Sequence, residues 1–182
     1  MYQIIKKDIL KFFCMYMEQG SKLAFFVFVL SFLMGCYFRK YSKVRSNRGL
    51  IFIKSIDIAL LTFYIYIVIG ITLLSRSENY KACINLYLLS TFFDPTIDSK
   101  YIYENVVLFI PFSILLYVLA KPFRNLKISL LIGVCFSLLI EVVQLITQFG
   151  SFILDDILTN TMGMLIGYLI CELVNKTFLS YF

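Results

Sequence analysis

The sequence predicts an all-α membrane protein, a polytopic helical bundle of about five transmembrane helices plus an N-terminal interfacial amphipathic helix. Two observations support this fold class. The chain of 182 residues is 60% hydrophobic and 15% charged, with a mean hydropathy of +0.86, which is too apolar for a soluble domain of this size. Its apolar residues also form five long runs, each able to cross a bilayer as a helix of ~20 residues.

Residues 1–21 are expected to lie at the membrane interface as an amphipathic helix. Lys6, Lys7, Asp8 and Lys11 are interspersed there with apolar side chains, in a pattern typical of interfacial helices. The segment lacks the small-residue cleavage site of a secretory signal, so we expect it to stay in the mature protein. Residues 22–182 then form the transmembrane domain.

The five spans are expected at 22–38, 56–75, 102–120, 126–147 and 156–175. Basic residues beside spans are retained preferentially in the cytoplasm. Ten of the 17 Lys and Arg residues lie in 39–55, 121–127 and the C-terminal tail, and seven lie in the remaining, longer segments. We therefore predict a multi-pass protein of the cell membrane with its N-terminus outside, its C-terminus inside and residues 75–100 as a long external loop.

The composition argues against several kinds of site. The five cysteines are scattered without a CxxC pair, so neither a disulfide framework nor a zinc site is predicted. Histidine is absent, so any chemistry must use carboxylates, amides, hydroxyls, Lys or Arg. The net charge of +6 is explained by the basic loops beside the spans, and nucleic-acid binding is therefore not predicted.

Polar side chains within or beside the spans are expected to gather in the outer half of the bundle. These residues are Arg76, Glu104, Asn105, Glu141, Gln144, Asp155, Asp156 and Asn160. Glu141 lies about 9 Å from the end of its span, at ~1.5 Å per residue. A carboxylate at that depth is costly in lipid, and it requires a partner, a water-filled pocket or a proton.

Two stripes of polar and small residues indicate which helix faces contact protein. The fourth span has Gly133, Ser137, Glu141, Gln144 and Gln148 at intervals of three or four, so these residues share one face.

The fifth span has Asp156 and Asn160 above a groove formed by Gly163 and Gly167, where another helix of this chain or of a second copy could approach closely. Asp155 and Asp156 also fit the first turn of a helix. In the third span, Pro111 is expected to kink the helix.

Four segments, taken in order, resemble the VanZ-like family of small bacterial membrane proteins. They are TLLSR at 72–76, NVVLFIPFSILL at 105–116, SLLIEVVQLI at 137–146 and DDILTNTMGMLIGY at 155–168, so the core motifs span 72–168. The motif positions include Arg76, Asn105, Pro111, Phe112, Glu141, Gln144, Asp155, Asp156, Asn160, Thr161 and Gly163. Where family members often have an Arg and a further acid, this chain has Gly150 and Ile153. The resemblance implies a role at the cell envelope, associated in some members with resistance to glycopeptide antibiotics, chiefly teicoplanin.

The favoured interpretation is an outward-facing polar pocket that binds or shields an envelope lipid or polymer. Its ligand-binding residues would be Arg76, Asn105, Glu141, Gln144, Asp155, Asp156 and Asn160, with Arg76 engaging a phosphate or carboxylate. The alternative is a membrane enzyme that modifies a lipid-linked envelope substrate, with Glu141 or Asp156 as general base. No cofactor is predicted for the binding role, whereas the acids of an enzyme would suit a divalent cation such as Mg²⁺.

Two further interpretations stay open. A transporter requires a continuous polar path, and the inner halves of the spans offer little beyond Ser113, Ser129 and Gly133. A network of Arg, Glu, Asp and Asn side chains can also serve only to fix helix packing. Whether the outer polar residues are open to the outside distinguishes a ligand site from such a network.

Overall fold

The computed structural model describes residues 2–41, 48–71, 83–89, 100–148 and 150–180. The chain divides into two units, Met1–Gly70 and Ile71–Phe182, here called unit 1 and unit 2. Among the described residues, five helices are long and apolar enough to cross a membrane: Tyr16–Tyr37, Gly49–Ile69, Ile102–Leu119, Leu126–Thr147 and Leu154–Thr177. The prediction of an all-α bundle with five spans is confirmed, and the chain is a multi-pass membrane protein.

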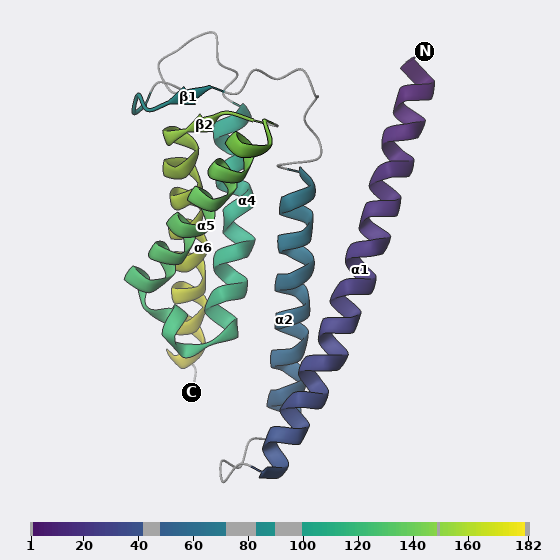
Figure 1. Ribbon diagram of the computed structural model, residues 1–182. Helices are drawn as coiled ribbons and strands as arrows, with labels where there is room; N and C mark the ends of the chain where they lie inside the picture. The colour runs from purple at the N-terminus through teal and green to yellow at the C-terminus, as the bar shows by residue number, and fades with distance from the viewer. Residues whose placement is uncertain (1, 42–47, 72–82, 90–99, 149, 181–182) are drawn as a thin grey trace. The chain divides into compact units, whose positions relative to one another are not determined.

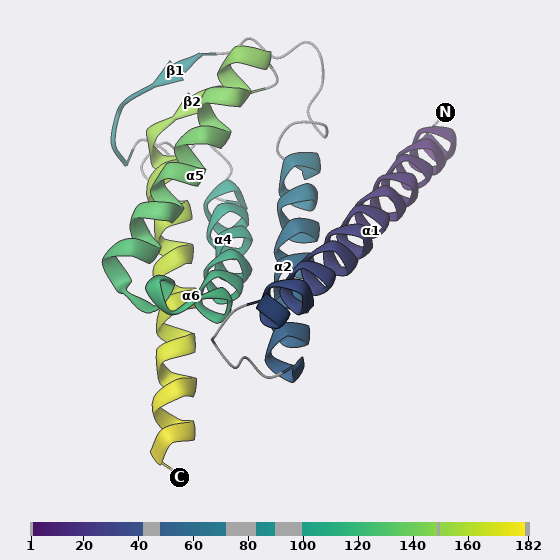
Figure 2. The same ribbon diagram turned by 60° about the horizontal axis from the view of Figure 1, so that its bottom comes forward.

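The elements of each unit follow one another along the chain, and from α4 to α6 the connections are short. Unit 1 contains α1 (Tyr2–Tyr41) and α2 (Arg48–Ile69). Unit 2 contains β1 (Ile84–Asn85), α4 (Lys100–Leu119), the 3₁₀ turn η2 (Lys121–Arg124), α5 (Leu126–Thr147), β2 (Phe152–Ile153) and α6 (Leu154–Ser180). Figures 1 and 2 show these elements from two directions.

Unit 1 is an antiparallel pair of helices, drawn in purple and blue in Figure 1. A Cβ added at Gly20 would lie 2.6 Å from Tyr66, and one added at Gly35 would lie 2.6 Å from Ile51, so both glycines permit close contact with α2. The Tyr16 hydroxyl donates to the Tyr66 carbonyl at 2.8 Å, and the two rings stack with centroids 4.2 Å apart. Aromatic packing and small residues therefore hold this pair together.

The first two spans begin earlier than the sequence predicted. Helix α1 runs without a break through residue 21, and its apolar span starts at Tyr16. The span in α2 starts at Gly49 and therefore includes Lys54. A lysine near the end of a span can extend its ammonium group to the interface, so one basic residue does not end the helix. The interfacial position of residues 1–21 stays a prediction.

In unit 2, α6 packs mainly against α4 and next against α5 (Figure 2). Gly163 and Gly167 carry the close contact, because a Cβ at either position would collide with the backbone carbonyls of Val106 or Ile110 on α4. The predicted groove of α6 is thus occupied by a helix of the same chain. The Ser113 hydroxyl of α4 donates to the Met164 carbonyl at 2.8 Å and adds a polar link.

The interior of unit 2 contains small polar side chains as well as apolar ones such as Phe109 and Met164, and large apolar side chains also cover its outside. Ser113, Ser129 and Ser137 are buried, whereas Leu131 and Ile146 expose most of their surface. This distribution suits a hydrocarbon solvent, where helices meet through small and polar residues and present apolar residues to lipid.

Local capping explains where α5 and α6 begin and end. The Asn125 side chain accepts from the backbone N–H of Lys127 at 3.0 Å and caps the start of α5. Helix α5 ends at Thr147, and Gln148 follows in the left-handed region with φ 59° and an exposed side chain. The expectation that Gln148 continues the protein-facing stripe is wrong, because the helical periodicity stops one residue before it. Asp155 and Asp156 do lie in the first turn of α6, as predicted.

A short parallel pairing joins two distant segments of unit 2. Ile84 pairs with Phe152 and Asn85 with Ile153, and the Phe152 N–H donates to the Cys83 carbonyl at 2.9 Å. The sequence did not predict these strands, since two residues are too few to show a strand period. We call residues 83–89 and 150–153 the outer cap, because the predicted topology places this end of unit 2 outside.

Candidate functional site at the outer end of unit 2

Glu141 lies on the protein-facing stripe of α5, as its spacing predicted. Its side chain is 2% exposed, and Oε2 accepts the backbone N–H of Ile153 at 2.8 Å. Ile153 directly precedes α6. The carboxylate therefore lies beside the N-terminal end of a helix, where unpaired N–H groups and the helix dipole favour negative charge. This contact compensates part of the cost of burying the acid.

Asp155 is fully buried in the first turn of α6 and connects this helix to the outer cap. Its Oδ1 accepts the backbone N–H of Leu89 at 2.6 Å. Leu89 has φ 65°, a left-handed conformation that is unfavourable for a side chain of this size. The hydrogen bond to Asp155 therefore holds the cap in a backbone conformation that Leu89 alone would seldom adopt.

Asn160 and Gln144 complete the buried polar residues at this end. Asn160 Nδ2 donates to Ser137 Oγ at 2.8 Å, which joins α6 to α5 one turn below Glu141. Gln144 is buried on the same face of α5. We call Glu141, Gln144, Asp155 and Asn160 the outer polar cluster. Its members come from two helices, and backbone N–H groups of the cap supply the hydrogen bonds to Glu141 and Asp155.

The cap is also fixed by Ser151, a residue that the sequence analysis did not single out. The Cys83 backbone N–H donates to Ser151 Oγ at 3.1 Å, and the Cys83 Sγ lies 3.1 Å from the same oxygen. Ser151 is buried, whereas residues 84 and 86–89 of the cap expose apolar or aromatic side chains. No sequence signal indicates this pairing, because 68 residues separate its two partners.

The remaining predicted site residues are placed differently. Asn105 on α4 and Asp156 on α6 are half-buried, while Glu104 is exposed. Arg76 lies outside the described residues, so its predicted partnership with the acids stays a prediction. In the part of unit 2 that the structure describes, the outer polar cluster is buried under the cap, and an open pocket at the cluster stays a prediction.

Cation binding by the predicted acids also stays a prediction. Within the described residues, no three Cys, Asp or Glu side chains gather in a way that would hold a metal ion. Glu141 and Asp155 instead direct a carboxylate oxygen to a backbone N–H.

A second polar arrangement, at the opposite end of unit 2, was missed by the sequence analysis. The Tyr117 hydroxyl donates to Glu172 Oε1 at 2.8 Å, and the Tyr168 hydroxyl donates to the Arg124 carbonyl at 2.8 Å. The spacing of Tyr168 and Glu172, four residues apart on one helix, was the only hint in the sequence.

Comparison with known proteins places the chain in a family. A family model described as VanZ/LLP1 matches residues 26–175, which include all the core motifs at 72–168. The chain belongs to the VanZ/LLP1 family. It is 31% identical over 126 residues to "Protein VanZ" of Enterococcus faecium, an alignment that covers 68% of this chain and 78% of that protein. No solved structure matches this VanZ/LLP1 chain.

The family match confirms the resemblance drawn from the four motifs. It also extends beyond them, because it begins within α1 and ends within α6. The family region of this VanZ/LLP1 protein therefore includes residues of both units: in unit 1, which has none of the quoted motifs, it covers α1 from residue 26 and all of α2.

Proposed function

We propose that this VanZ/LLP1 protein acts in the cell membrane, at the outer face of the cell envelope, and contributes to resistance against glycopeptide antibiotics of the teicoplanin type. It does so by binding or shielding an envelope lipid or polymer at the outer end of unit 2. The observation that carries the proposal is the pair of buried carboxylates, Glu141 and Asp155, that hold the outer cap by its backbone.

The two carboxylates give the cap a defined shape. Without Asp155 the Leu89 N–H would lose its acceptor, and without Glu141 the Ile153 N–H would lose its own. An unpaired backbone N–H in such a part-buried place costs free energy, so the chain would rearrange to satisfy it. The buried acids therefore support a binding surface formed by the cap.

The exposed face of the cap suits an amphiphilic ligand. Leu86, Tyr87 and Leu88 are all exposed, and Tyr87 exposes 82% of its surface. Apolar and aromatic side chains at this level of a membrane protein prefer the boundary between lipid and water. A lipid-linked envelope component lies in the same boundary, with its polar part outside the membrane. The half-buried Asp156 and Asn105 supply polar groups near the same end.

The hydrogen bonds also favour binding over the enzymatic alternative. A general base must reach the proton that it removes. Glu141, one of the two candidate bases, already accepts from Ile153 under the cap through its Oε2, as Asp155 does from Leu89. We therefore assign Glu141 and Asp155 to positioning of the cap. Asp156, the other candidate base, is half-buried and is the residue through which the enzymatic alternative would act.

The test is teicoplanin susceptibility of a sensitive Gram-positive host that expresses the protein at matched membrane levels. We expect the wild type to raise the concentration needed to stop growth. Glu141→Ala should abolish protection, whereas Glu141→Gln should retain most of it, because an amide oxygen still accepts the Ile153 N–H. Val142→Ala is the matched control, since Val142 is the neighbouring exposed residue.

Each of the other outcomes contradicts part of the proposal. A wild type that gives no protection would refute the resistance role. Loss of protection in Glu141→Gln with normal membrane levels would show that the acid itself is needed, as the enzymatic alternative requires. Full protection by Glu141→Ala would show that the cap contact is irrelevant.

A further inference from the structure

The end of unit 2 opposite the outer cap holds one arginine in a fixed orientation. Arg124 ends the 3₁₀ turn between α4 and α5. Its guanidinium carbon lies 5.3 Å from the centroid of the Tyr117 ring, and its Nε donates to the Tyr117 carbonyl at 3.4 Å. The contact with the ring and the hydrogen bond to the backbone carbonyl therefore fix the orientation of the Arg124 side chain.

The surroundings of Arg124 are fixed in turn. The Tyr117 hydroxyl donates to Glu172 Oε1 at 2.8 Å, which sets the position of the ring beneath the guanidinium. The Tyr168 hydroxyl donates to the Arg124 carbonyl at 2.8 Å, which sets the backbone. The two tyrosine rings meet edge to face, with centroids 5.7 Å apart. Helices α4 and α6 thus support one exposed cation.

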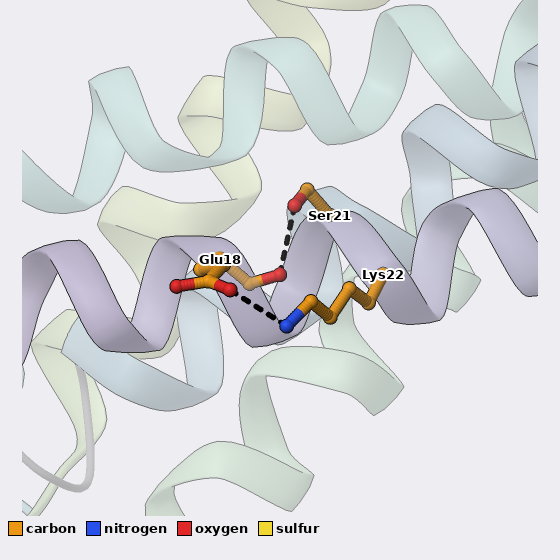
Figure 3. A network of polar contacts seen from close by, with 3 residues as sticks. All are labelled: Glu18, Ser21 and Lys22. Atoms are coloured by element: carbon orange, nitrogen blue, oxygen red, sulfur yellow. Dashed lines mark hydrogen bonds and ion pairs between the residues drawn. The ribbon is translucent and has the colours of Figure 1, made fainter.

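Arg124 differs from Lys22, another exposed cation, in the use of its charge. Lys22 Nζ lies 2.6 Å from Glu18 Oε1 within α1 (Figure 3). Arg124 has no carboxylate within ion-pair distance among the residues that the structure describes, and Glu172 accepts from Tyr117 instead. Nε is the only guanidinium nitrogen with a hydrogen bond to another described residue. The two terminal amino groups keep their donors for an anion.

The position of this arginine matches the level of lipid headgroups. The apolar span of α4 ends at Leu119 and that of α5 begins at Leu126, so Arg124 lies in the turn where both spans reach the same boundary of the membrane. Lys121 and Lys127 flank it, both exposed, and no acidic residue lies between 119 and 126. Tyrosines are typical of the same level.

We propose that Arg124, with Lys121 and Lys127, binds the phosphate of an anionic phospholipid in the membrane leaflet at this end of unit 2. The planar guanidinium forms paired hydrogen bonds with phosphate oxygens, and the two lysines add charge. An anionic leaflet attracts each nearby basic residue, so three of them favour an anionic lipid over a zwitterionic one. The site is independent of the outer cap.

The test measures lipid bound to the full-length protein by native mass spectrometry, with phosphatidylglycerol and phosphatidylcholine titrated separately into detergent. We expect wild type to prefer phosphatidylglycerol. Arg124→Gln should weaken phosphatidylglycerol binding about fivefold, which corresponds to about 1 kcal/mol per basic residue beside an anionic surface. Arg124→Lys should lie between the two. Lys22→Gln, the control, removes the same charge and should bind as wild type.

The double variant Lys121→Gln and Lys127→Gln covers the case in which Arg124→Gln fails to fold, because these lysines have no part in the Tyr117 contacts. It should also weaken phosphatidylglycerol binding. The proposal is overturned if Lys22→Gln loses as much affinity as Arg124→Gln, or if a folded Arg124→Gln and the double variant both keep wild-type affinity. Inorganic phosphate that binds as tightly as phosphatidylglycerol would show a free-anion site instead.

Discussion

The two ends of unit 2 use charged side chains in opposite ways. At the outer end, Glu141 and Asp155 are buried and accept backbone N–H groups. At the other end, Arg124 is exposed, and its guanidinium rests on an aromatic ring. The acids therefore determine the shape of the chain around them, whereas the arginine is arranged to meet something outside it.

The difference follows from how the two kinds of charge are satisfied. A buried carboxylate needs donors from the protein, because it has lost its water. Backbone N–H groups at a helix start and in a loop are well suited to this role. An exposed guanidinium keeps water as its partner until an anion replaces it, and a ring beneath it limits its motion without neutralising it.

The largest effect should come from separating α4 and α6, the helices that connect the two ends of unit 2. Gly163→Val should force α6 away from the Val106 carbonyl of α4, because no space for a Cβ exists there. We expect the free energy of unfolding to fall by about 3 kcal/mol, which is in the upper part of the range for overpacking a tight contact. Thermal unfolding in detergent measures it. Met162→Val, on the exposed face of the same helix, is the control and should unfold as wild type.

If both variants unfold at the same temperature, the close contact between α4 and α6 is not what stabilises unit 2. A large drop in the control alone would contradict the assignment of Met162 to the exposed face.

The next largest effect should isolate the outer end. Asp155→Ala leaves the Leu89 N–H without its acceptor. We expect the free energy of local opening of the cap to fall by about 1–3 kcal/mol. Hydrogen exchange should show a faster Leu89 amide, while the amides of η2 stay unchanged. Asp155→Asn retains an acceptor oxygen and should preserve much of the protection. If the Leu89 amide exchanges at the same rate in wild type and Asp155→Ala, the hydrogen bond to Asp155 does not stabilise the cap.

A smaller effect should isolate the opposite end. Tyr117→Phe removes the hydroxyl that donates to Glu172 but retains the ring beneath Arg124. We expect a loss of about 1 kcal/mol, typical of one hydrogen bond, with phosphatidylglycerol binding reduced less than in Arg124→Gln. Thermal unfolding and the lipid titration measure the two parts. If Tyr117→Phe loses as much lipid affinity as Arg124→Gln, the ring alone does not hold Arg124 in place and the hydroxyl is required.

The smallest effect should come from the polar pair within the bundle. The hydrogen bond between Asn160 and Ser137 should contribute about 0.6 kcal/mol, the average for such bonds between membrane helices. A double-mutant cycle with Asn160→Ala and Ser137→Ala measures the coupling. A coupling near zero would mean that the two side chains only fill space.

Much of the fold could be predicted because long apolar runs leave few alternatives. The span at 126–147 was predicted to the residue, and in the structure Asn125 caps its start and Gln148 follows its end in the left-handed region. The first two spans were predicted to start at 22 and 56, later than at Tyr16 and Gly49 in the structure, where Lys22 and Lys54 lie within the spans. In the structure both basic residues lie inside helices and keep their charged ends exposed.

Only the buried side chains of the candidate site could be predicted from the sequence; the backbone groups that bind them could not. Spacing along α5 correctly placed Glu141 and Gln144 on the buried face, since helical periodicity is visible in sequence. Their surroundings were not predictable, because the donors that the described residues supply to Glu141 and Asp155 are backbone groups of Ile153 and Leu89. Any residue other than proline offers such a group, so the sequence contains no mark of it.

The pairing of β1 with β2 has a consequence for how the protein is made. Cys83 and Ser151 enclose α4, η2 and α5 between them in the chain. During synthesis the cap therefore has no partner until both helices have entered the membrane and the polypeptide has returned to the side on which it started. Contacts so distant in sequence form late in folding. The cap can therefore form only if the preceding helices were inserted in the correct order and direction.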